Sequence, residues 1–304
     1  MKILITGATG FIGKKLSQLL IDNGINVNYL STSKSKIKSK PNFKGFYWNP
    51  DEGKIDENCL IGVDAIIHLA GANIANRWTK SYKQEIIESR VLSANLLFNI
   101  LKKNPHQVKH IISASGTAIY PDSDTKIYNE SETSIADGFL SNVVVKWEEG
   151  ADQFKLLGIK VSKVRTGIVY STDGGALVEI LKPIKLGLGA SFGTGKQIQS
   201  WIHINDVVNI YYFILKNNLE GTFNAVAPET ISDEKLTKTI AQILKKPLFL
   251  PNIPRFIMQL ILGDMCELLF TNKNISSQKV IDAGFQFQFP NINLALTDIL
   301  KKKE

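Results

Sequence analysis

The sequence predicts an α/β protein built on a doubly wound parallel sheet, with a smaller lobe towards the C-terminus. Up to about residue 165, short apolar runs of strand length alternate with segments of helical periodicity, which is the pattern of successive βαβ units. The opening apolar run leads directly into glycines and then a helix. Beyond Val169 the alternation gives way to a glycine-rich stretch and to helices separated by prolines. A chain of 304 residues accommodates one large domain with such a lobe.

The individual elements follow from the same periodicities. Strands are expected at residues 2–6, 25–30, 63–69, 108–114 and 160–165. Helices are expected directly after the first glycines and at residues 82–103, 139–157, 205–216 and 233–245. We interpret the apolar segment 256–270 as a buried or half-buried helix. The main domain should cover residues 1–170, with residues 200–228 returning to it, and residues 171–304 should mainly form the smaller lobe.

Composition and charge exclude several classes of protein. With 44% hydrophobic and 21% charged residues, the chain is not expected to be disordered, collagen-like or a coiled coil. The net charge of +8 fits nucleic acid, a membrane surface or an anionic small ligand. No zinc-finger spacing, RNA-binding signature or basic helix is present, so we expect no nucleic-acid partner and no metal. No signal peptide or membrane-spanning segment is expected either, which predicts a cytoplasmic protein.

The strongest local motif is the glycine turn, Gly-Ala-Thr-Gly-Phe-Ile-Gly, at residues 7–13. Its first glycine permits a tight turn, the second lets a diphosphate approach the backbone, and the third lets the helix pack closely on the strand. The free N–H groups and positive dipole of that helix favour an anion. The motif predicts a Rossmann-type dinucleotide site. Its expected contacts are Gly7, Thr9, Gly10, Phe11, Ile12 and Gly13.

The region after the second strand bears on which dinucleotide binds. NAD-selective sites usually place a carboxylate there to bind the ribose 2′-hydroxyl. Residues 30–34 read Leu-Ser-Thr-Ser-Lys and contain no acid. Ser31, Ser33 and Lys34 suit a 2′-phosphate instead, so NADP is the expected cofactor. The alternative is that Lys34 only begins a solvated loop.

A second coenzyme contact is expected where the strand 63–69 ends. Leu69, Ala70 and Gly71 form a turn of small residues that lets the backbone lie beside the adenine and ribose. His68 lies within a nearly continuous apolar run, which favours a core histidine over a catalytic one.

Segments spread along the chain together resemble one family. They are HLAGANI at 68–74, RWT at 77–79, KQEI at 83–86, SRV at 89–91, ISAS at 112–115, RTGIV at 165–169, DGGAL at 173–177, LGLG at 186–189, SWIHI at 200–204, AP at 227–228 and AGFQF at 283–287. As a set they resemble the sugar nucleotide epimerase-like, or epimerase-family, oxidoreductases of the extended short-chain dehydrogenase/reductase superfamily. The resemblance covers almost the whole chain. It implies a Rossmann domain, a small substrate lobe and NADP.

The resemblance also implies where the chemistry should lie. In the superfamily a Tyr moves the substrate proton, a Lys four residues later lowers the pKa of the Tyr, and a Ser or Thr orients the substrate oxygen. Ser115 follows the strand 108–114 and resembles that catalytic Ser; the alternative is a Ser that caps the strand.

The Tyr-x-x-x-Lys pair is not found on the helix that follows. If Lys146 fills the Lys position, Asn142 stands in place of the Tyr, and Asn is no base at neutral pH. If Glu148 sets the register instead, the Tyr and Lys positions fall on Leu140 and Val144, which are both apolar. Tyr212 and Lys216 match the spacing, but we interpret them as a chance pair on a downstream helix.

Other candidates lie at the ends of expected strands or in the loops that follow them. Tyr120 and His203 are the remaining candidates for proton transfer. The alternative for Tyr120, which we weigh at least equally, is that it only forms a wall of the pocket. Arg165 is expected at the coenzyme. The candidates for substrate binding are Arg77, Trp78, Thr166 and Trp201.

Two functions follow from these observations. The first is an NADP-dependent oxidoreductase or epimerase acting on a polar, sugar-like or anionic small molecule. The second is an NADP(H)-binding sensor that has lost catalysis. The missing Tyr-x-x-x-Lys pair favours the sensor, whereas Ser115, Arg77, Arg165 and His203 favour the enzyme, which we prefer. A homodimer is left open.

Overall fold

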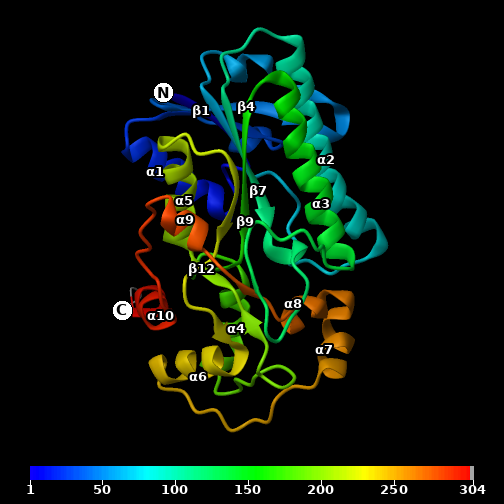
Figure 1. The fold of residues 1–304 in the computed structure, drawn as a ribbon, viewed down its shortest axis with the longest axis vertical. Coiled ribbons are helices and arrows are strands. Elements are labelled where there is room, and N and C mark those ends of the chain that lie inside the picture. Colours follow the sequence, from blue (N-terminus) through cyan, green and yellow to red (C-terminus); the bar gives the residue numbers. More distant parts are fainter. Residues whose placement is uncertain (302–304) are drawn as a thin grey trace.

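The computed structural model describes residues 1–301 and has a nine-stranded sheet at its centre (Figure 1). Its strand order is β13-β9-β7-β6-β1-β2-β4-β3, with β5 paired to β4. The parallel strands are β1 (Lys2–Thr6), β2 (Asn26–Ser31), β4 (Phe43–Asn49), β6 (Ala65–His68), β7 (His110–Gly116), β9 (Lys160–Thr166) and β13 (Gly221–Ala225). The short strands β3 (Ser39–Lys40) and β5 (Lys54–Ile55) pair antiparallel to β4.

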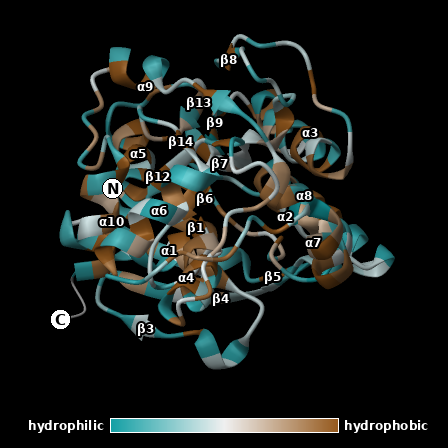
Figure 2. Ribbon diagram, turned by 90° about the horizontal axis from the view of Figure 1, so that it is seen from below, coloured by the Kyte–Doolittle hydropathy of each residue, from teal (hydrophilic) through white to brown (hydrophobic). Residues whose placement is uncertain are grey.

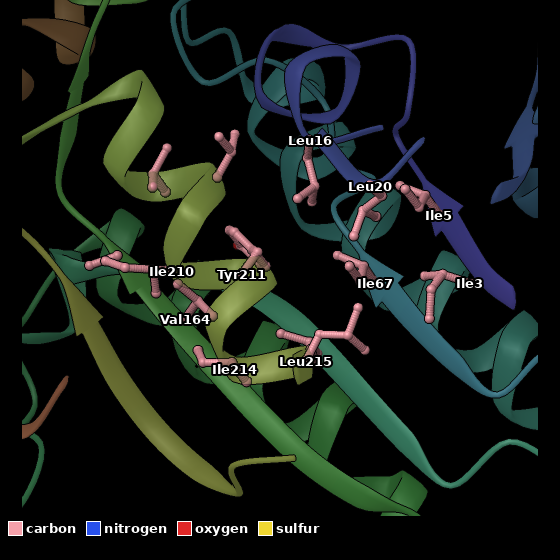
Figure 3. Packing of buried hydrophobic residues seen from close by; sticks show 14 of the residues in the cluster. Ile3, Ile5, Leu16, Leu20, Ile67, Val164, Ile210, Tyr211, Ile214 and Leu215 are labelled. Carbon is pink, nitrogen blue, oxygen red and sulfur yellow. The ribbon is translucent and has the colours of Figure 1, made fainter. Parts of the chain in front are cut away.

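Helices cover both faces of this sheet (Figure 1). On one face α1 (Phe11–Asp22) packs beside α5 (Ile204–Lys216), and on the other α2 (Lys80–Lys103) packs beside α3 (Phe139–Asp152). Because side chains alternate along a strand, Ile3 and Ile5 face the first pair of helices (Figure 3). Leu4, between them, faces the second pair. Burial on both faces explains why the central strands read as continuous apolar runs.

The lobe is assembled around a second pair of parallel strands, β10 (Ile168–Tyr170) and β12 (Trp201–His203). The helices α4 (Ala176–Lys185), α6 (Asp233–Ile243) and α10 (Ile292–Lys301) share one apolar cluster with them. The pairs β8 (Ile127–Tyr128) with β15 (Asn274–Ile275), and β11 (Ile198–Gln199) with β14 (Ile231–Ser232), tie distant segments together. The last short helices are α7 (Arg255–Leu262), α8 (Glu267–Phe270) and α9 (Gln278–Asp282).

The structure confirms the predicted fold class, and it adds elements that the periodicity did not indicate. Among them are the strand β4 near one edge of the sheet, the strand β13 at the other edge and the helix α4. In β4 the apolar run that would indicate a strand is interrupted by Gly45. This glycine lies under the ring of Tyr29, where a Cβ would come within 2.5 Å of the ring carbon Cζ. A strand that leaves room for a neighbour's aromatic ring does not look like an apolar run.

The segment 256–270 corrects the expectation of one buried or half-buried helix. It forms α7, a short 3₁₀ turn and α8. Helix α7 ends at Leu262 because the next residue, Gly263, has a left-handed φ of +59°. Phe256 and Leu260 are 64% and 79% exposed, and Figure 2 shows brown, hydrophobic residues on α7. The interpretation was wrong about a single helix and, for α7, about burial, because it took apolar composition as a sign of burial; most residues from 262 to 270 are half-buried as expected. None of the helices within residues 1–301 combines the length and the hydropathy that a membrane span requires.

Candidate coenzyme and substrate site

The glycine turn has the geometry of an anion cradle. Gly7 has φ +71°, and a Cβ there would come 3.0 Å from the backbone carbonyl of Leu69. A Cβ on Gly13 would lie 2.1 Å from the carbonyl oxygen of Gly7, so the close approach of α1 to β1 requires glycine. Gly10 immediately precedes α1, whose first turn contains neither an acidic residue nor a side-chain cap. The N–H groups at this helix end therefore remain available to a diphosphate, and the residues fit the expected dinucleotide.

The turn at Leu69, Ala70 and Gly71, called the 69–71 turn below, is held against β1 by a chain of hydrogen bonds. The Thr6 hydroxyl accepts from the backbone N–H groups of Leu69 and Ala70, both at 3.0 Å. The Thr6 Oγ1 also lies 2.8 Å from His68 Nδ1, and His68 Nε2 lies 3.3 Å from the Ser93 hydroxyl. Burial lowers the pKa of His68 to about 4, so the ring is neutral near pH 7. His68 therefore belongs to the scaffold of the turn.

The end of β2 lies at the same sheet edge, because Thr6 of β1 is in register with Leu30 of β2. Ser31 is buried, and its hydroxyl bonds the backbone N–H and C=O of Ser33 at 3.2 and 3.0 Å. Lys34 is exposed, with its Nζ 5.3 Å from the ring centre of Tyr47. Ser33 and Lys34 are thus accessible at the edge where a coenzyme ribose would lie, whereas Ser31 shapes the loop.

A buried polar row crosses the sheet beyond the turn. Ser115 of β7, Arg165 of β9 and Asn224 of β13 are in register on three neighbouring strands, so their side chains share one face. Glu148 of α3 lies over this row. It accepts from Ser115 Oγ at 2.7 Å, and from Arg165 through Nε at 2.7 Å and Nη2 at 3.0 Å. Lys163 adds a further contact of 3.1 Å to the same carboxylate.

The charges of this row stabilise one another. Burial alone would raise the pKa of Glu148, but the hydrogen bonds and charges of Arg165 and Lys163 hold that pKa below its usual value. Burial alone would likewise lower the pKa of Arg165, yet Glu148 raises it overall. The pair is therefore ionised near pH 7, and Ser115 donates its hydroxyl proton to a carboxylate.

Tyr120 belongs to the same network. It is 1% exposed, and its hydroxyl accepts from Arg165 Nη1 at 2.9 Å while donating to Asn224 Oδ1 at 2.8 Å. Burial raises the pKa of Tyr120 more than Arg165 lowers it. A hydroxyl that is bonded on both sides and hard to ionise is a poor general base, so this geometry favours the interpretation of Tyr120 as a wall residue.

The positions examined for the Tyr-x-x-x-Lys pair do not replace it. Asn142 and Lys146 are both exposed on α3, whereas Glu148 is the residue of that helix that reaches Ser115. Tyr212 lies on α5, on the opposite face of the sheet from α3, and its hydroxyl bonds Asn23 Oδ1 at 3.2 Å. This supports its interpretation as a chance match.

The expected substrate contacts fall into two groups. Arg77 is exposed and Thr166 is half-buried at the end of β9. Trp78 is buried instead, with its ring centre 5.1 Å from that of Phe139 and its Nε1 donating to the Ile74 carbonyl. Trp78 thus packs in the interior, and Arg77 is the accessible member of the pair.

Trp201 and His203 are interior residues of the lobe. Trp201 is 0% exposed and stacks on Tyr170, with ring centres 5.7 Å apart. His203 is 1% exposed, accepts from the backbone N–H of Asn205 at 3.1 Å, and lies with its Nε2 3.5 Å from Asp298. His203 caps α5 and Trp201 packs in the core of the lobe, so both are interior side chains, as Ser115 itself is at 4% exposed.

Glu148 and Asn224 are the residues that sequence reasoning missed. A signal for Glu148 was present, because it follows Leu140 and Val144 at four-residue spacing on the buried face of α3. A carboxylate at such a position requires a partner, and Arg165 at the end of the next strand could have been proposed. Asn224 carried no comparable signal, because β13 itself was not recognised.

Two regions of the chain match models of known families. The model of the NAD dependent epimerase/dehydratase family matches residues 3–140, and a domain of unknown function (DUF1731) matches residues 253–299. The chain is 34% identical over 304 residues to an epimerase family protein of Staphylococcus aureus (strain MRSA252), covering 98% of this chain and 99% of that protein. It is 33% identical over 300 residues to an epimerase family protein of Staphylococcus haemolyticus, again covering 98% and 99%.

Solved structures are similar over the full length of the chain. The human epimerase family protein SDR39U1 (isoform2), crystallised with NADPH, superposes with a TM-score of 0.85 at 31% identity, covering 99% of both chains. A nucleoside-diphosphate sugar epimerase of Corynebacterium glutamicum superposes with a TM-score of 0.77 at 27% identity, covering 99% of this chain and 58% of that one.

Proposed function

Because the chain belongs to the NAD-dependent epimerase/dehydratase family, as an epimerase family protein, we propose that it is an NADP-dependent oxidoreductase or epimerase. Its substrate would be a polar, sugar-like or anionic small molecule. The observation that carries the proposal is the glycine turn, where a Cβ on Gly7 or Gly13 would meet backbone and where the end of α1 lacks both acid and cap. NADPH in the crystal structure of the similar human protein supports the choice of coenzyme.

The residues of this chain divide the binding between them. Backbone N–H groups of the glycine turn would hold the diphosphate, and Ser33 with Lys34 would hold the 2′-phosphate. When bound, the coenzyme supplies or accepts the hydride. The 69–71 turn, fixed by Thr6, would flank the adenosine half.

Ser115 would orient the substrate. Because its proton is donated to Glu148, the lone pairs of Oγ remain to accept a hydrogen bond from a substrate hydroxyl. This role positions a C–O–H group without transferring its proton to Ser115. Neither Tyr120 nor Glu148 is a favourable proton acceptor, since the one is hard to ionise and the other is held as a stable ion.

Coenzyme titration tests the proposal. NADPH should bind more tightly than NADH, and Lys34→Ala should reduce that preference about tenfold, as the loss of one charge-assisted hydrogen bond would. Lys36→Ala is the matched control, because Lys36 is exposed in the same 3₁₀ turn. Equal affinity for NADH and NADPH in the unchanged protein would contradict the assignment of NADP.

The sensor remains the second candidate, because no Tyr-x-x-x-Lys pair reaches Ser115 and Tyr120 is bonded on both sides. A panel of carbonyl compounds and nucleotide sugars, followed by the absorbance of the reduced nicotinamide, separates the two. Turnover that Ser115→Ala reduces supports the enzyme. Tight coenzyme binding without turnover over the whole panel supports the sensor.

A further inference from the structure

Arg90 is a buried cation directly beneath the coenzyme-facing 69–71 turn. It lies on α2, is 6% exposed, and its guanidinium carbon is 4.5 Å from the ring centre of Trp147 on α3. A Cβ on Gly71 would come 2.9 Å from that carbon, so this glycine leaves space for the guanidinium. Gly71 itself is exposed. The exposed turn therefore packs against the Cζ, Nη1 and Nη2 atoms of Arg90.

The hydrogen bonds of Arg90 leave one edge of the guanidinium without an acceptor. Nη1 donates to the Ile86 carbonyl at 2.8 Å, and Nη1 and Nη2 both donate to the Ala72 carbonyl at 3.3 Å. Nε is buried with no hydrogen-bond partner, and no carboxylate within residues 1–301 forms an ion pair with Arg90. The N–H of Nε and the second N–H of Nη2 form the fork that matches two oxygens of a carboxylate or phosphate.

A second donor belongs to the aromatic ring next to Arg90. The indole Nε1 of Trp147 is also buried without an acceptor in the part of the chain that the structure describes. An indole N–H can only donate, as can a guanidinium. Two neighbouring side chains from adjacent helices thus each carry a buried donor for which the described protein supplies no acceptor. Burial of a cation in this way is costly unless an anion completes it.

We propose that Arg90 and Trp147 form a binding site for an oxyanion, a phosphate or carboxylate, carried by a ligand that lies on the 69–71 turn. The inference rests on the proposed function, because that turn is the expected coenzyme contact. The oxyanion would bind the free edge formed by Nε and the second N–H of Nη2. The bonds of Nη1 and Nη2 to the Ala72 carbonyl, both 3.3 Å, are long, so a shift of the exposed turn breaks them readily and gives the oxyanion access. The oxyanion belongs either to the coenzyme diphosphate or to an acidic substrate.

Inorganic pyrophosphate is the probe, with binding measured by isothermal titration calorimetry. Arg90→Gln should weaken binding about tenfold or more, the loss expected for a charge-assisted fork. Arg90→Lys should recover part of the affinity, since it keeps the charge but not the fork, and Trp147→Phe should cause a smaller loss. Lys80→Gln, at an exposed position of the same helix, should bind as the unchanged protein does. Equal affinity in the unchanged protein and Arg90→Gln would overturn the proposal.

Competition with NADPH identifies the source of the oxyanion. If NADPH displaces the Arg90-dependent pyrophosphate, the site takes the coenzyme diphosphate; if both bind together, it takes an acid of the substrate. If the unchanged protein binds no NADPH, the proposed function is contradicted. The pyrophosphate affinities of the unchanged protein and Arg90→Gln still test the Arg90 site in that case. If instead the unchanged protein binds NADPH, and Arg90→Gln binds NADPH and pyrophosphate equally well, the function stands and the Arg90 site is wrong.

A structural role for Arg90 predicts a different result in thermal unfolding. If Arg90 only fastened the 69–71 turn, Arg90→Met would lower the melting temperature in the absence of any anion. A ligand site predicts that Arg90→Met melts within a few degrees of the unchanged protein or higher, and that pyrophosphate raises the melting temperature of the unchanged protein but not of the variant. A lower melting temperature together with unchanged pyrophosphate affinity would establish the structural role and overturn the proposal.

Discussion

Arg165 and Arg90 are both buried arginines on the α2–α3 side of the sheet, and they differ in what faces them. Arg165 presents Nε and Nη2 to both oxygens of Glu148, whereas the same edge of Arg90 meets no acid among residues 1–301. Glu148 raises the pKa of Arg165 overall, while burial lowers the pKa of Arg90 to about 10. A buried cation with its acid is part of the scaffold. One without an acid is available for a ligand.

Removing the acid from the paired arginine should have the largest effect on stability. In Glu148→Gln, Arg165 would lose its counter-charge and Lys163 would keep only Asp152, at 2.9 Å, so we expect a loss of about 3–5 kcal/mol in the free energy of unfolding. Urea denaturation measures it. The double variant Glu148→Leu with Arg165→Met should recover much of that loss, because no buried charge is left unpaired. A loss well below about 1 kcal/mol would show that Arg165 does not need its partner.

Part of the loss of stability in acid should come from the Glu148–Arg165 pair. The folded pKa of Glu148 lies below its unfolded value, so its contribution is complete above the unfolded pKa and is lost as pH falls through the folded pKa. The free energy of unfolding should therefore fall as the pH drops below about 4.3, the usual pKa of Glu. The fall in melting temperature with acid should be shallower in Glu148→Gln. Curves of equal slope would contradict the assignment.

The unpaired arginine should behave in the opposite way. Arg90→Met keeps a similar volume and removes a buried charge, so its free energy of unfolding should stay within about 1 kcal/mol of the original or rise. Arg165→Met is the matched comparison and should be clearly destabilised, because it removes both hydrogen bonds of the guanidinium to Glu148 and leaves that buried carboxylate only Lys163 and Ser115. Chemical denaturation of the two variants side by side is the measurement. The comparison fails if both arginines prove equally necessary for stability.

The smallest change is expected at Ser115. Ser115→Ala removes one of the donors to Glu148 but leaves the three contacts from Arg165 and Lys163. We expect a loss of about 1 kcal/mol or less in the free energy of unfolding. Ser115→Thr, which keeps the hydroxyl, is the control. A much larger loss would indicate that Ser115 serves the scaffold more than the ligand.

The sequence was sufficient for the fold class and for the glycine turn, because both depend on local patterns. Gly7, Gly10 and Gly13 act through backbone spacing within seven residues, which any reading of the chain can recover. The strands that alternate with helices are likewise visible as apolar runs. The roles of the predicted coenzyme and substrate residues stay predictions, since only binding experiments test them.

What the sequence could not provide depends on contacts between distant segments. Glu148 and Arg165 acquire their partners only when α3 packs on β9, and the Tyr120 hydroxyl is bonded by Asn224 from 104 positions later in the chain. Arg90 gave no sign of burial on a helix rich in polar residues. The exposed apolar side of α7 shows the reverse error, in which composition suggested a core that tertiary packing did not form.

The late position of β13 imposes an order on biosynthesis. Residues 221–225 complete the sheet beside β9, although β9 itself is translated about fifty residues earlier. During that interval a growing polypeptide on the ribosome carries an open edge whose amides and carbonyls could pair with a neighbouring nascent strand. Arrest of translation between these two segments would therefore leave an aggregation-prone fragment, even though the glycine turn was made long before.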